Sequence, residues 1–273
     1  GEPVFLEKER WEEIKKTTST YTVACQQLLN PIVGSDIAFK EEWWQEWEVR
    51  PYTMNVYIMC DPAHSRKKES NRTAFAVVGV DANYNKFLLD GICHRMSLSE
   101  RWDSIRKLRI KWKRVPGIRE VKIGYERYGA QSDIEHFKEM MRIDGSSFPI
   151  YELNWTGGGG SQSKRDRIQR LEPDLKDGSF FFPYPTDEKR LTSNQQDMKV
   201  RKQEFLISKK IMRKDEEGKL YDLTDWVRKN EYSLFPTIHP DFLDALSRIY
   251  DMDPIPPLFR RHQKLEPEAE ARY

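Results

Sequence analysis

Residues 56–63 have the sequence VYIMCDPA, in which an apolar run ends at an acid, Asp61, followed by Pro62. A short and almost continuous apolar run is typical of a strand buried on both faces of a sheet. Two similar runs follow, TAFAVVGV at 73–80 and FLLDGIC at 87–93, with the turn sequence DANYNK between them. Short connections between successive strands indicate antiparallel pairing. The sequence therefore predicts a three-stranded meander that begins with the strand leading to Asp61.

Helices and strands alternate after this meander. Apolar residues recur at steps of three and four through residues 97–114, which predicts a helix that Ser97 or Ser99 can cap. Further strands are predicted at 121–125, 149–153 and 179–182, and further helices at 131–142, 164–171, 186–210 and 241–251. This order predicts an α/β fold with a mixed sheet flanked by helices. The ribonuclease H-like fold has this order, and several other mixed α/β folds share parts of it.

The two ends of the chain differ from this middle part. Residues 1–50 show no strand-like alternation, so we expect a helical linker ahead of a domain that spans residues 51–254. Residues 255–273 are rich in proline and charge, which is typical of a tail outside a packed domain. In the first segment, the side chains of Trp43, Trp44 and Trp47 either pack between linker and domain or offer a stacking platform for bases.

The composition excludes several classes of protein. The 273 residues include 46 Lys and Arg and 44 Asp and Glu, so the net charge of +2 says nothing for or against a nucleic-acid partner, and only local patches of charge can indicate one. No apolar run approaches the roughly 20 residues that cross a membrane. Three widely spaced cysteines, Cys25, Cys60 and Cys93, form neither a disulfide framework nor a zinc motif. A reducing cytoplasm is therefore the expected location.

Acids stand at three places where predicted elements begin or end. Asp61 follows the first strand, Glu126 follows the strand at 121–125, and Asp241 and Asp244 share one face at the start of the last helix. If the two strands are parallel neighbours, their carboxyl ends place Asp61 beside Glu126. Carboxylate oxygens suit Mg²⁺ or Mn²⁺, and two such ions about 4 Å apart can hydrolyse a phosphodiester. Taken singly, each acid also has a structural explanation as a turn residue, a helix cap or half of an ion pair.

Four stretches of the sequence match a known family in their order and spacing. They are CDPA at 60–63, GYERYGAQ at 124–131, SKRDRIQRLEPDLKDGSFFFP at 163–183 and HPDFLDALSRIYDMDP at 239–254. Through them the chain resembles the nuclease domain of the large terminase subunit of tailed bacteriophages. Upstream, ACQQLLNPI at 24–32 resembles the stretch that closes the ATPase half of that family, so residues 1–50 would be a remnant of that half.

This resemblance implies a ribonuclease H-like fold and an endonuclease that cuts concatemeric viral double-stranded DNA with two divalent ions, Mg²⁺ or Mn²⁺. It implies Asp61, Glu126 and Asp244 as the catalytic metal ligands, with Asp241 as a neighbouring or fourth ligand. The portal protein and the small terminase subunit would be its partners, and the cytoplasm of the bacterial host its location. No stretch fits the P-loop pattern GxxxxGK[ST], so we expect no bound nucleotide and no ATPase activity in this chain.

Some basic residues lie next to these acids along the chain, and others follow a run of glycines. The candidates for DNA contact are Arg66, Lys67, Lys68, Arg127, Lys164, Arg165, Arg167 and Arg170. The last four follow four consecutive glycines at 157–160, a run that suits close approach of backbone to a phosphate. If the acids cluster, these cations would rim the site and hold phosphates without reading the bases. Otherwise they are ordinary solvated charges, as we expect for the basic face of helix 97–114 that includes Arg101.

Three functions stay open from the sequence. The leading hypothesis is a metal-dependent endonuclease of the terminase type. The second is another ribonuclease H-like nuclease, of the resolvase or recombinase type, which the stretch QQLLNP at 26–31 disfavours. The third is a non-catalytic module that clamps DNA or docks on a portal, in which the acids are structural.

Overall fold

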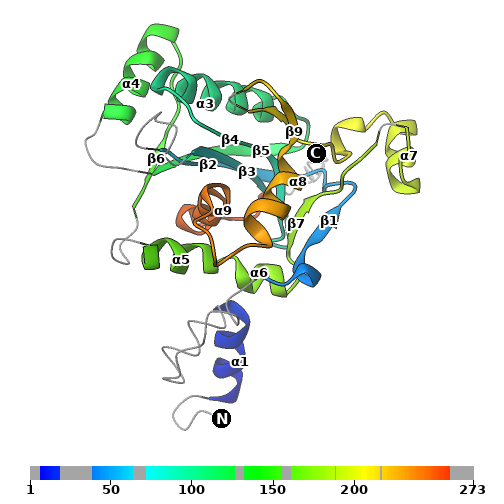
Figure 1. Ribbon diagram of the computed structural model, residues 1–273. Helices are drawn as coiled ribbons and strands as arrows, with labels where there is room; N and C mark the ends of the chain where they lie inside the picture. The colour runs from blue at the N-terminus through cyan, green and yellow to red at the C-terminus, as the bar shows by residue number, and fades with distance from the viewer. Residues whose placement is uncertain are drawn as a thin grey trace, which may run out of the picture.

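The structure, a computed structural model, describes residues 7–18, 39–63, 72–126, 132–154, 161–187, 189–215 and 217–258. At the centre of these residues is a seven-stranded mixed sheet in the order β1-β7-β4-β3-β2-β5-β6 (Figure 1). Its strands are β1 (Gln45–Trp47), β2 (Met54–Asp61), β3 (Thr73–Val80), β4 (Lys86–His94), β5 (Ile118–Glu126), β6 (Tyr151–Leu153) and β7 (Phe180–Pro183). β3 pairs antiparallel with β2 and β4, whereas the other pairs in the sheet are parallel.

The predicted meander consists of β2, β3 and β4. Every residue of β2 and β3 is buried, as their nearly continuous apolar runs predict. β5 adds in parallel to the free side of β2, and β6 adds in parallel to β5. The order β4-β3-β2-β5-β6 around an antiparallel β3 confirms the predicted ribonuclease H-like mixed sheet.

Helices cover both faces of the sheet (Figure 1). α3 (Leu98–Lys113) and α4 (Ser132–Asp144) lie on one face, and α5 (Ser161–Gln169), α8 (Leu223–Val227) and α9 (Asp241–Ser247) lie on the other. Side chains of β2 alternate between two core clusters, with Val56 and Ile58 in the α3 cluster and Tyr57 and Met59 in the α9 cluster. No helix of the described residues is both long and apolar enough to span a membrane.

The predicted helix at 97–114 is α3, and Ser97 is its N-cap. The Ser97 hydroxyl accepts a hydrogen bond from the Glu100 N–H at 3.3 Å, and the Glu100 carboxylate accepts one from the Ser97 N–H at 2.6 Å. This reciprocal capping box satisfies N–H groups that a helix start otherwise leaves without partners. The predicted apolar stripe faces the sheet, where Trp102, Ile105, Leu108 and Trp112 are buried.

The expectation that no strand precedes residue 50 is wrong. β1 forms the edge of the sheet beside β7, although it is only three residues long. Trp44, next to β1, stacks on Phe182 of β7 with ring centroids 3.6 Å apart, and both Trp44 and Trp47 are 7% exposed. These two tryptophans therefore pack in the core, and neither offers a platform for bases. Within the predicted helical linker, α1 (Lys8–Thr17) is helical and contacts α6 (Glu172–Lys176), whereas residues 19–38 lie outside the described residues.

The prediction of a helix across 186–210 is wrong for most of that range. Within it, α7 (Ser193–Val200) and a 3-10 turn at Glu204–Leu206 are the helical parts of the described residues. Lys202 has a positive φ of 58°, a left-handed conformation that ends α7. The chain then runs extended into an unpredicted hairpin, β8 (Met212–Lys214) and β9 (Leu220–Asp222), whose short strands carry exposed charges and so show no apolar run.

Candidate metal centre

Two of the predicted acids end neighbouring parallel strands. Asp61 is the last residue of β2 and Glu126 the last residue of β5. The register pairs Cys60 with Tyr125, so Asp61 and Glu126 follow at adjoining positions on the same edge of the sheet. Their side chains are mostly buried, since Asp61 is 8% exposed and Glu126 is 6% exposed. The predicted juxtaposition of the two strand ends is thus present.

The first turn of α9 adds the other two acids. α9 packs across β2 and β3, and both Asp241 and Asp244 belong to its first turn. Asp244 is 1% exposed. Burial, then the negative charges of Asp244 and Glu126, raise the pKa of Asp61 well above its ordinary value. The causes of this shift indicate that acids from β5 and α9 lie close enough to Asp61 to repel its negative charge.

Basic side chains neutralise much of this negative charge. Arg167 of α5 binds Asp244 with two hydrogen bonds of 2.5 Å, a bidentate geometry. The Lys164 ammonium lies 3.0 Å from Asp241 Oδ1 and 3.4 Å from Asp244 Oδ2. Burial lowers the pKa of Lys164, but the surrounding carboxylates outweigh it and raise that pKa above its ordinary value. Two residues predicted to contact DNA are therefore bound to candidate metal ligands.

Glu126 has a different partner, which the sequence did not indicate. The fully buried Arg248, just after α9, forms an ion pair with Glu126 Oε1 and another with Asp251 at 3.0 Å. The second oxygen, Glu126 Oε2, is buried and has no hydrogen-bond partner among the residues that the structure describes. A buried carboxylate oxygen without a donor is costly unless a proton or a cation reaches it. Glu126 thus keeps one oxygen available for a ligand.

The donor set fits a hard divalent cation, because it consists of carboxylate oxygens with one of them unpartnered. Asp61, Glu126, Asp244 and Asp241 are the residues that would hold Mg²⁺ or Mn²⁺. Yet the described residues contain no group of three or more His, Cys, Asp or Glu side chains arranged to hold a metal ion. Arg167 and Lys164 instead occupy oxygens of Asp244 and Asp241. Metal binding would require these cations to release them.

A buried acid that the sequence analysis missed holds the start of α9. The Glu231 carboxylate accepts the N–H groups of Asp241 and Phe242 at 3.1 Å and of Leu243 at 2.9 Å. Pro240, in the N-cap position, has no side chain that can do this. Burial raises the pKa of Glu231 to about 7, against the effect of these donors. Glu231 is thereby a positioning residue for the helix turn that carries Asp241 and Asp244.

A second missed feature connects the segments that follow Asp61 and Glu126. Arg101 of α3 donates to the Ala63 carbonyl at 2.5 Å and to Asp133 of α4 at 2.7 Å. The Tyr125 hydroxyl also donates to Asp133. Only 11% of the Arg101 side chain is exposed, so the expectation that it is solvated is wrong. A basic helix face alone cannot reveal this, because the contact depends on how α3 lies on the sheet.

The remaining DNA candidates differ in how far the structure describes them. Arg170 pairs with Asp251 at 2.6 Å and donates to the Ser247 carbonyl at 3.2 Å, so it also faces the segment around α9. Arg165 is half-buried, and no ion pair to another described residue engages it. Arg66, Lys67, Lys68, Arg127 and the glycine run at 157–160 lie outside the described residues.

Comparisons with known proteins yield structural likeness alone. No family model and no curated protein matches the sequence. A solved structure of the human cytomegalovirus terminase nuclease domain, soaked with Mn, is similar at 12% identity and a TM-score of 0.40, over 91% of this chain and 95% of that one. The yeast mitochondrial Holliday junction resolvase Ydc2 is similar at 8% identity and a TM-score of 0.27, over 49% of this chain and 65% of that one. Such low scores assign no function, which must rest on the site itself.

Proposed function

We propose that this chain is a divalent-metal-dependent nuclease that hydrolyses DNA phosphodiester bonds. One observation carries the proposal: Asp61, Glu126 and Asp244 come from three distant segments to one buried edge of the sheet, where burial and mutual repulsion raise the pKa of Asp61. Burying like charges together is unfavourable for folding, and such arrangements cluster at functional sites. Bound divalent cations would offset this repulsion, which would explain why the three carboxylates lie together.

In this proposal the residues have distinct roles. The carboxylates of Asp61, Glu126 and Asp244 hold the metal, and Asp241 is a neighbouring ligand. Bound Mg²⁺ or Mn²⁺ supplies Lewis-acid activation of water and stabilisation of phosphoryl charge. Glu231 and Arg101 orient the backbone that carries the acids. Lys164, once released from Asp241, is placed to neutralise a phosphate at the same edge.

The finer form of the proposal is the nuclease of a viral genome-packaging terminase, which cuts concatemeric double-stranded DNA in the cytoplasm of a bacterial host. Its support is the order and spacing of the four stretches at 60–63, 124–131, 163–183 and 239–254. In that role the portal protein and the small terminase subunit are the proposed partners. A resolvase-type nuclease would use the same acids on branched DNA.

One observation favours a non-catalytic alternative. Arg167 and Arg248 already pair with Asp244 and Glu126, as they would if the acids only held α5 and α9 on the sheet. In that case the chain would bind DNA or a portal without cutting.

A plasmid-cleavage assay separates these functions. We expect the chain to nick and linearise supercoiled plasmid in Mn²⁺, to lose this activity in excess EDTA, and to cut linear duplex and four-way junction DNA at similar rates. Strong preference for the junction would indicate a resolvase. Absence of cleavage by a folded protein, across Mn²⁺ and Mg²⁺ concentrations, would refute the nuclease proposal.

A further inference from the structure

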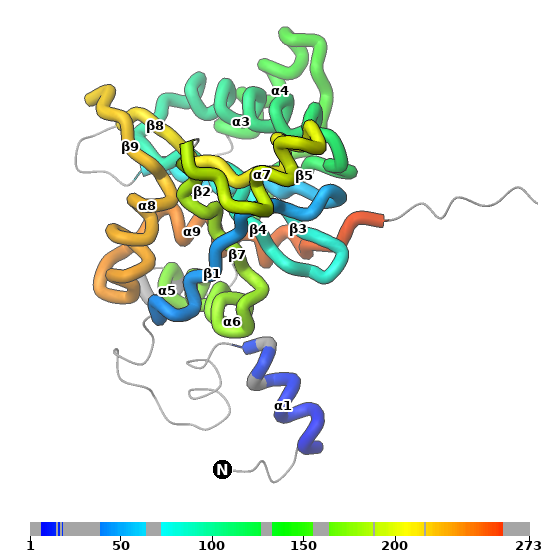
Figure 2. Tube along the Cα trace, turned by 90° about the vertical axis from the view of Figure 1, so that its right-hand side faces the viewer, coloured from blue at the N-terminus to red at the C-terminus, as the bar shows by residue number. Residues whose placement is uncertain are grey.

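A strongly basic part of the described chain lies away from the candidate metal centre. Residues 199–214 contain seven Lys or Arg and one acid, Glu204, within a chain whose net charge is +2. Figure 1 places α7, where this segment begins, on the opposite side of the molecule from the start of α5, and in Figure 2 it lies on the side that faces the viewer. We call six of these residues the lysine surface: Lys199, Arg201, Lys202, Lys209, Lys210 and Lys214.

All six side chains of the lysine surface are exposed. Within the part of the chain that the structure describes, none of them forms an ion pair. The seventh cation, Arg213, is the exception, because it pairs with the buried Asp90 of β4 and donates to the Gly91 carbonyl at 2.7 Å. Arg213 thus fixes the hairpin that continues the surface, while its neighbours leave their charge uncompensated.

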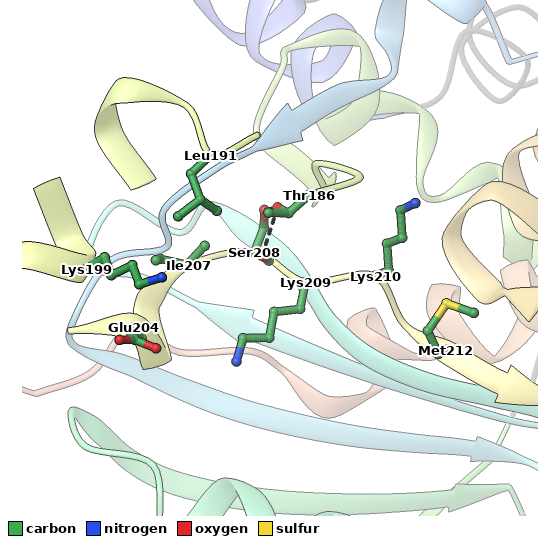
Figure 3. A pocket seen from close by; sticks show the side chains of 9 residues that line it. All are labelled: Thr186, Leu191, Lys199, Glu204, Ile207, Ser208, Lys209, Lys210 and Met212. Atoms are coloured by element: carbon green, nitrogen blue, oxygen red, sulfur yellow. Dashed lines mark hydrogen bonds between the residues drawn. The ribbon is translucent and has the colours of Figure 1, made fainter. Parts of the chain in front are cut away.

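Three of these lysines surround a hollow of about 540 Å³ (Figure 3). Lys199 reaches it from α7, and Lys209 and Lys210 reach it from the extended segment after the 3-10 turn. Thr186 and Ser208 also line it, hydrogen-bonded to each other at 2.8 Å, and Gln195 donates to Thr186 at 2.9 Å. Because these buried polar groups satisfy one another, the charged groups available at the hollow are the three ammonium groups and one carboxylate, that of Glu204, which leaves a net positive charge.

Backbone hydrogen bonds place this surface near the start of β2 and so indicate how far it lies from the acids. The Ser208 N–H donates to the Glu48 carbonyl at 2.8 Å, and the Arg50 N–H donates to the Leu206 carbonyl at 2.9 Å. The segment therefore runs beside the residues that lead into β2, whereas Asp61 ends β2. A strand of eight residues spans on the order of 25 Å. Duplex DNA covers that length in about seven base pairs, at about 3.4 Å per pair.

We propose that the lysine surface binds the phosphate backbone of duplex DNA that extends from the candidate metal centre. The proposal takes its ligand from the proposed function. Exposed ammonium groups without paired acids attract phosphates at any sequence, and binding them releases condensed counterions. Lysines are point charges without the planar fork that fits a carboxylate, so they suit a repeating polyanion better than the acidic side chains of a protein partner.

Duplex length provides the test. The triple variant Lys199→Gln, Lys209→Gln, Lys210→Gln is compared with wild type and with a control of equal charge change, Lys107→Gln, Lys113→Gln, Lys138→Gln, on α3 and α4. Binding is measured by fluorescence anisotropy without divalent metal, from about 50 to 200 mM salt. The two ligands are a 30-base-pair duplex and a hairpin-closed duplex of about 5 base pairs, which at about 3.4 Å per pair is too short to span both regions.

For the long duplex, we expect the triple variant to bind about tenfold more weakly and the salt slope to fall by about 3. Binding of the short duplex and of the control should change less than twofold. Equal losses on both duplexes, or none on the long one, would overturn the proposal, as would equally strong binding of polyglutamate. The result is independent of cleavage, so a chain that never cuts DNA but shows this length dependence would refute the nuclease function and keep the surface.

Discussion

The two basic regions of this molecule have opposite surroundings. On α5, the side chains of Lys164 and Arg167 are 16% and 7% exposed, and both bind acids of α9. At the lysine surface, side chains of the same types are exposed and unpaired among the described residues. The family resemblance made the α5 cations DNA candidates in the sequence, but in the structure the acids of α9 engage them. The surroundings of a cation, more than its type, determine whether its charge is available to a partner.

The two regions should also respond differently to salt and to substitution. A buried pair is poorly screened, and removing one member leaves the other buried and charged. An exposed lysine is screened within about 10 Å and contributes little to folding. The following predictions use these differences, in order of decreasing effect.

The largest effect is expected at Asp61. Asp61→Asn should reduce plasmid cleavage in Mn²⁺ by roughly 10³-fold, because metal-held charge stabilisation is the main source of rate in such a site. Folding should not suffer, since the substitution removes a charge that Asp244 and Glu126 repel. Nicking rates and thermal midpoints would be measured beside Asp103→Asn, an α3 control expected to be fully active. Normal cleavage by folded Asp61→Asn protein would remove Asp61 from the site.

The next effect tests the paired region directly. Arg167→Met should lower the free energy of unfolding by about 3–5 kcal/mol without metal, because it leaves the Asp244 carboxylate buried without its bidentate partner. Arg165→Met, two residues away on the same helix, should cost less than about 0.5 kcal/mol. Urea denaturation measures both.

Metal should partly reverse this loss. If Asp244 is a metal ligand, Mn²⁺ should stabilise Arg167→Met protein more than wild type, because in the variant the ion no longer competes with a guanidinium for the Asp244 carboxylate. Wild-type stability of the variant would mean that Arg167 does not hold Asp244 in solution and is free for DNA. Equal stabilisation by Mn²⁺ in both proteins would separate Asp244 from the metal.

A smaller effect is expected at the start of α9. Glu231→Gln should cost about 1–2 kcal/mol, because the amide nitrogen of glutamine cannot accept the N–H groups that one carboxylate oxygen now accepts. Asp225→Asn, at an exposed acid of α8, should cost less than about 0.5 kcal/mol. Loss of Mn²⁺ affinity together with stability would show that Glu231 positions the acids. An unchanged free energy of unfolding would contradict its role as a cap.

The sequence predicts the parts of this fold that local pattern determines. The meander is predictable because β2, β3 and β4 are long apolar runs and a short turn joins β3 to β4, and Asp61 and Glu126 are predictable because each ends such a run. β1 is not predictable, since three residues give no periodicity and its partner β7 lies far along the chain. The hairpin of β8 and β9 is missed because each strand is only three residues long.

The ion pairs of the candidate site are not predictable from pattern. Whether Arg167 faces Asp244 or solvent depends on how α5 and α9 lie on the sheet, and no spacing within either helix encodes it. Arg248 and Glu231 are likewise buried by tertiary packing, although isolated charges are usually exposed. Sequence reasoning therefore found the acids and misjudged the cations, because acids at strand ends have a local signature and paired cations do not.

The smallest effect is expected at Arg165, which combines the two regions in one residue. It lies on α5 among the paired cations and is half-buried. Like the residues of the lysine surface, however, it forms no ion pair with a described residue. If availability of charge determines DNA contact, Arg165→Gln should weaken duplex binding about two- to threefold and lower the salt slope by about 1, with the thermal midpoint unchanged. Lys138→Gln, on α4, is the matched control.

When Arg165→Gln is combined with the triple variant of the lysine surface, the losses of affinity should multiply, because sites this far apart act independently. No loss at Arg165 would mean that α5 contacts no phosphate in the bound state, so that DNA reaches the acids along another path, for which residues 66–68 remain the candidates.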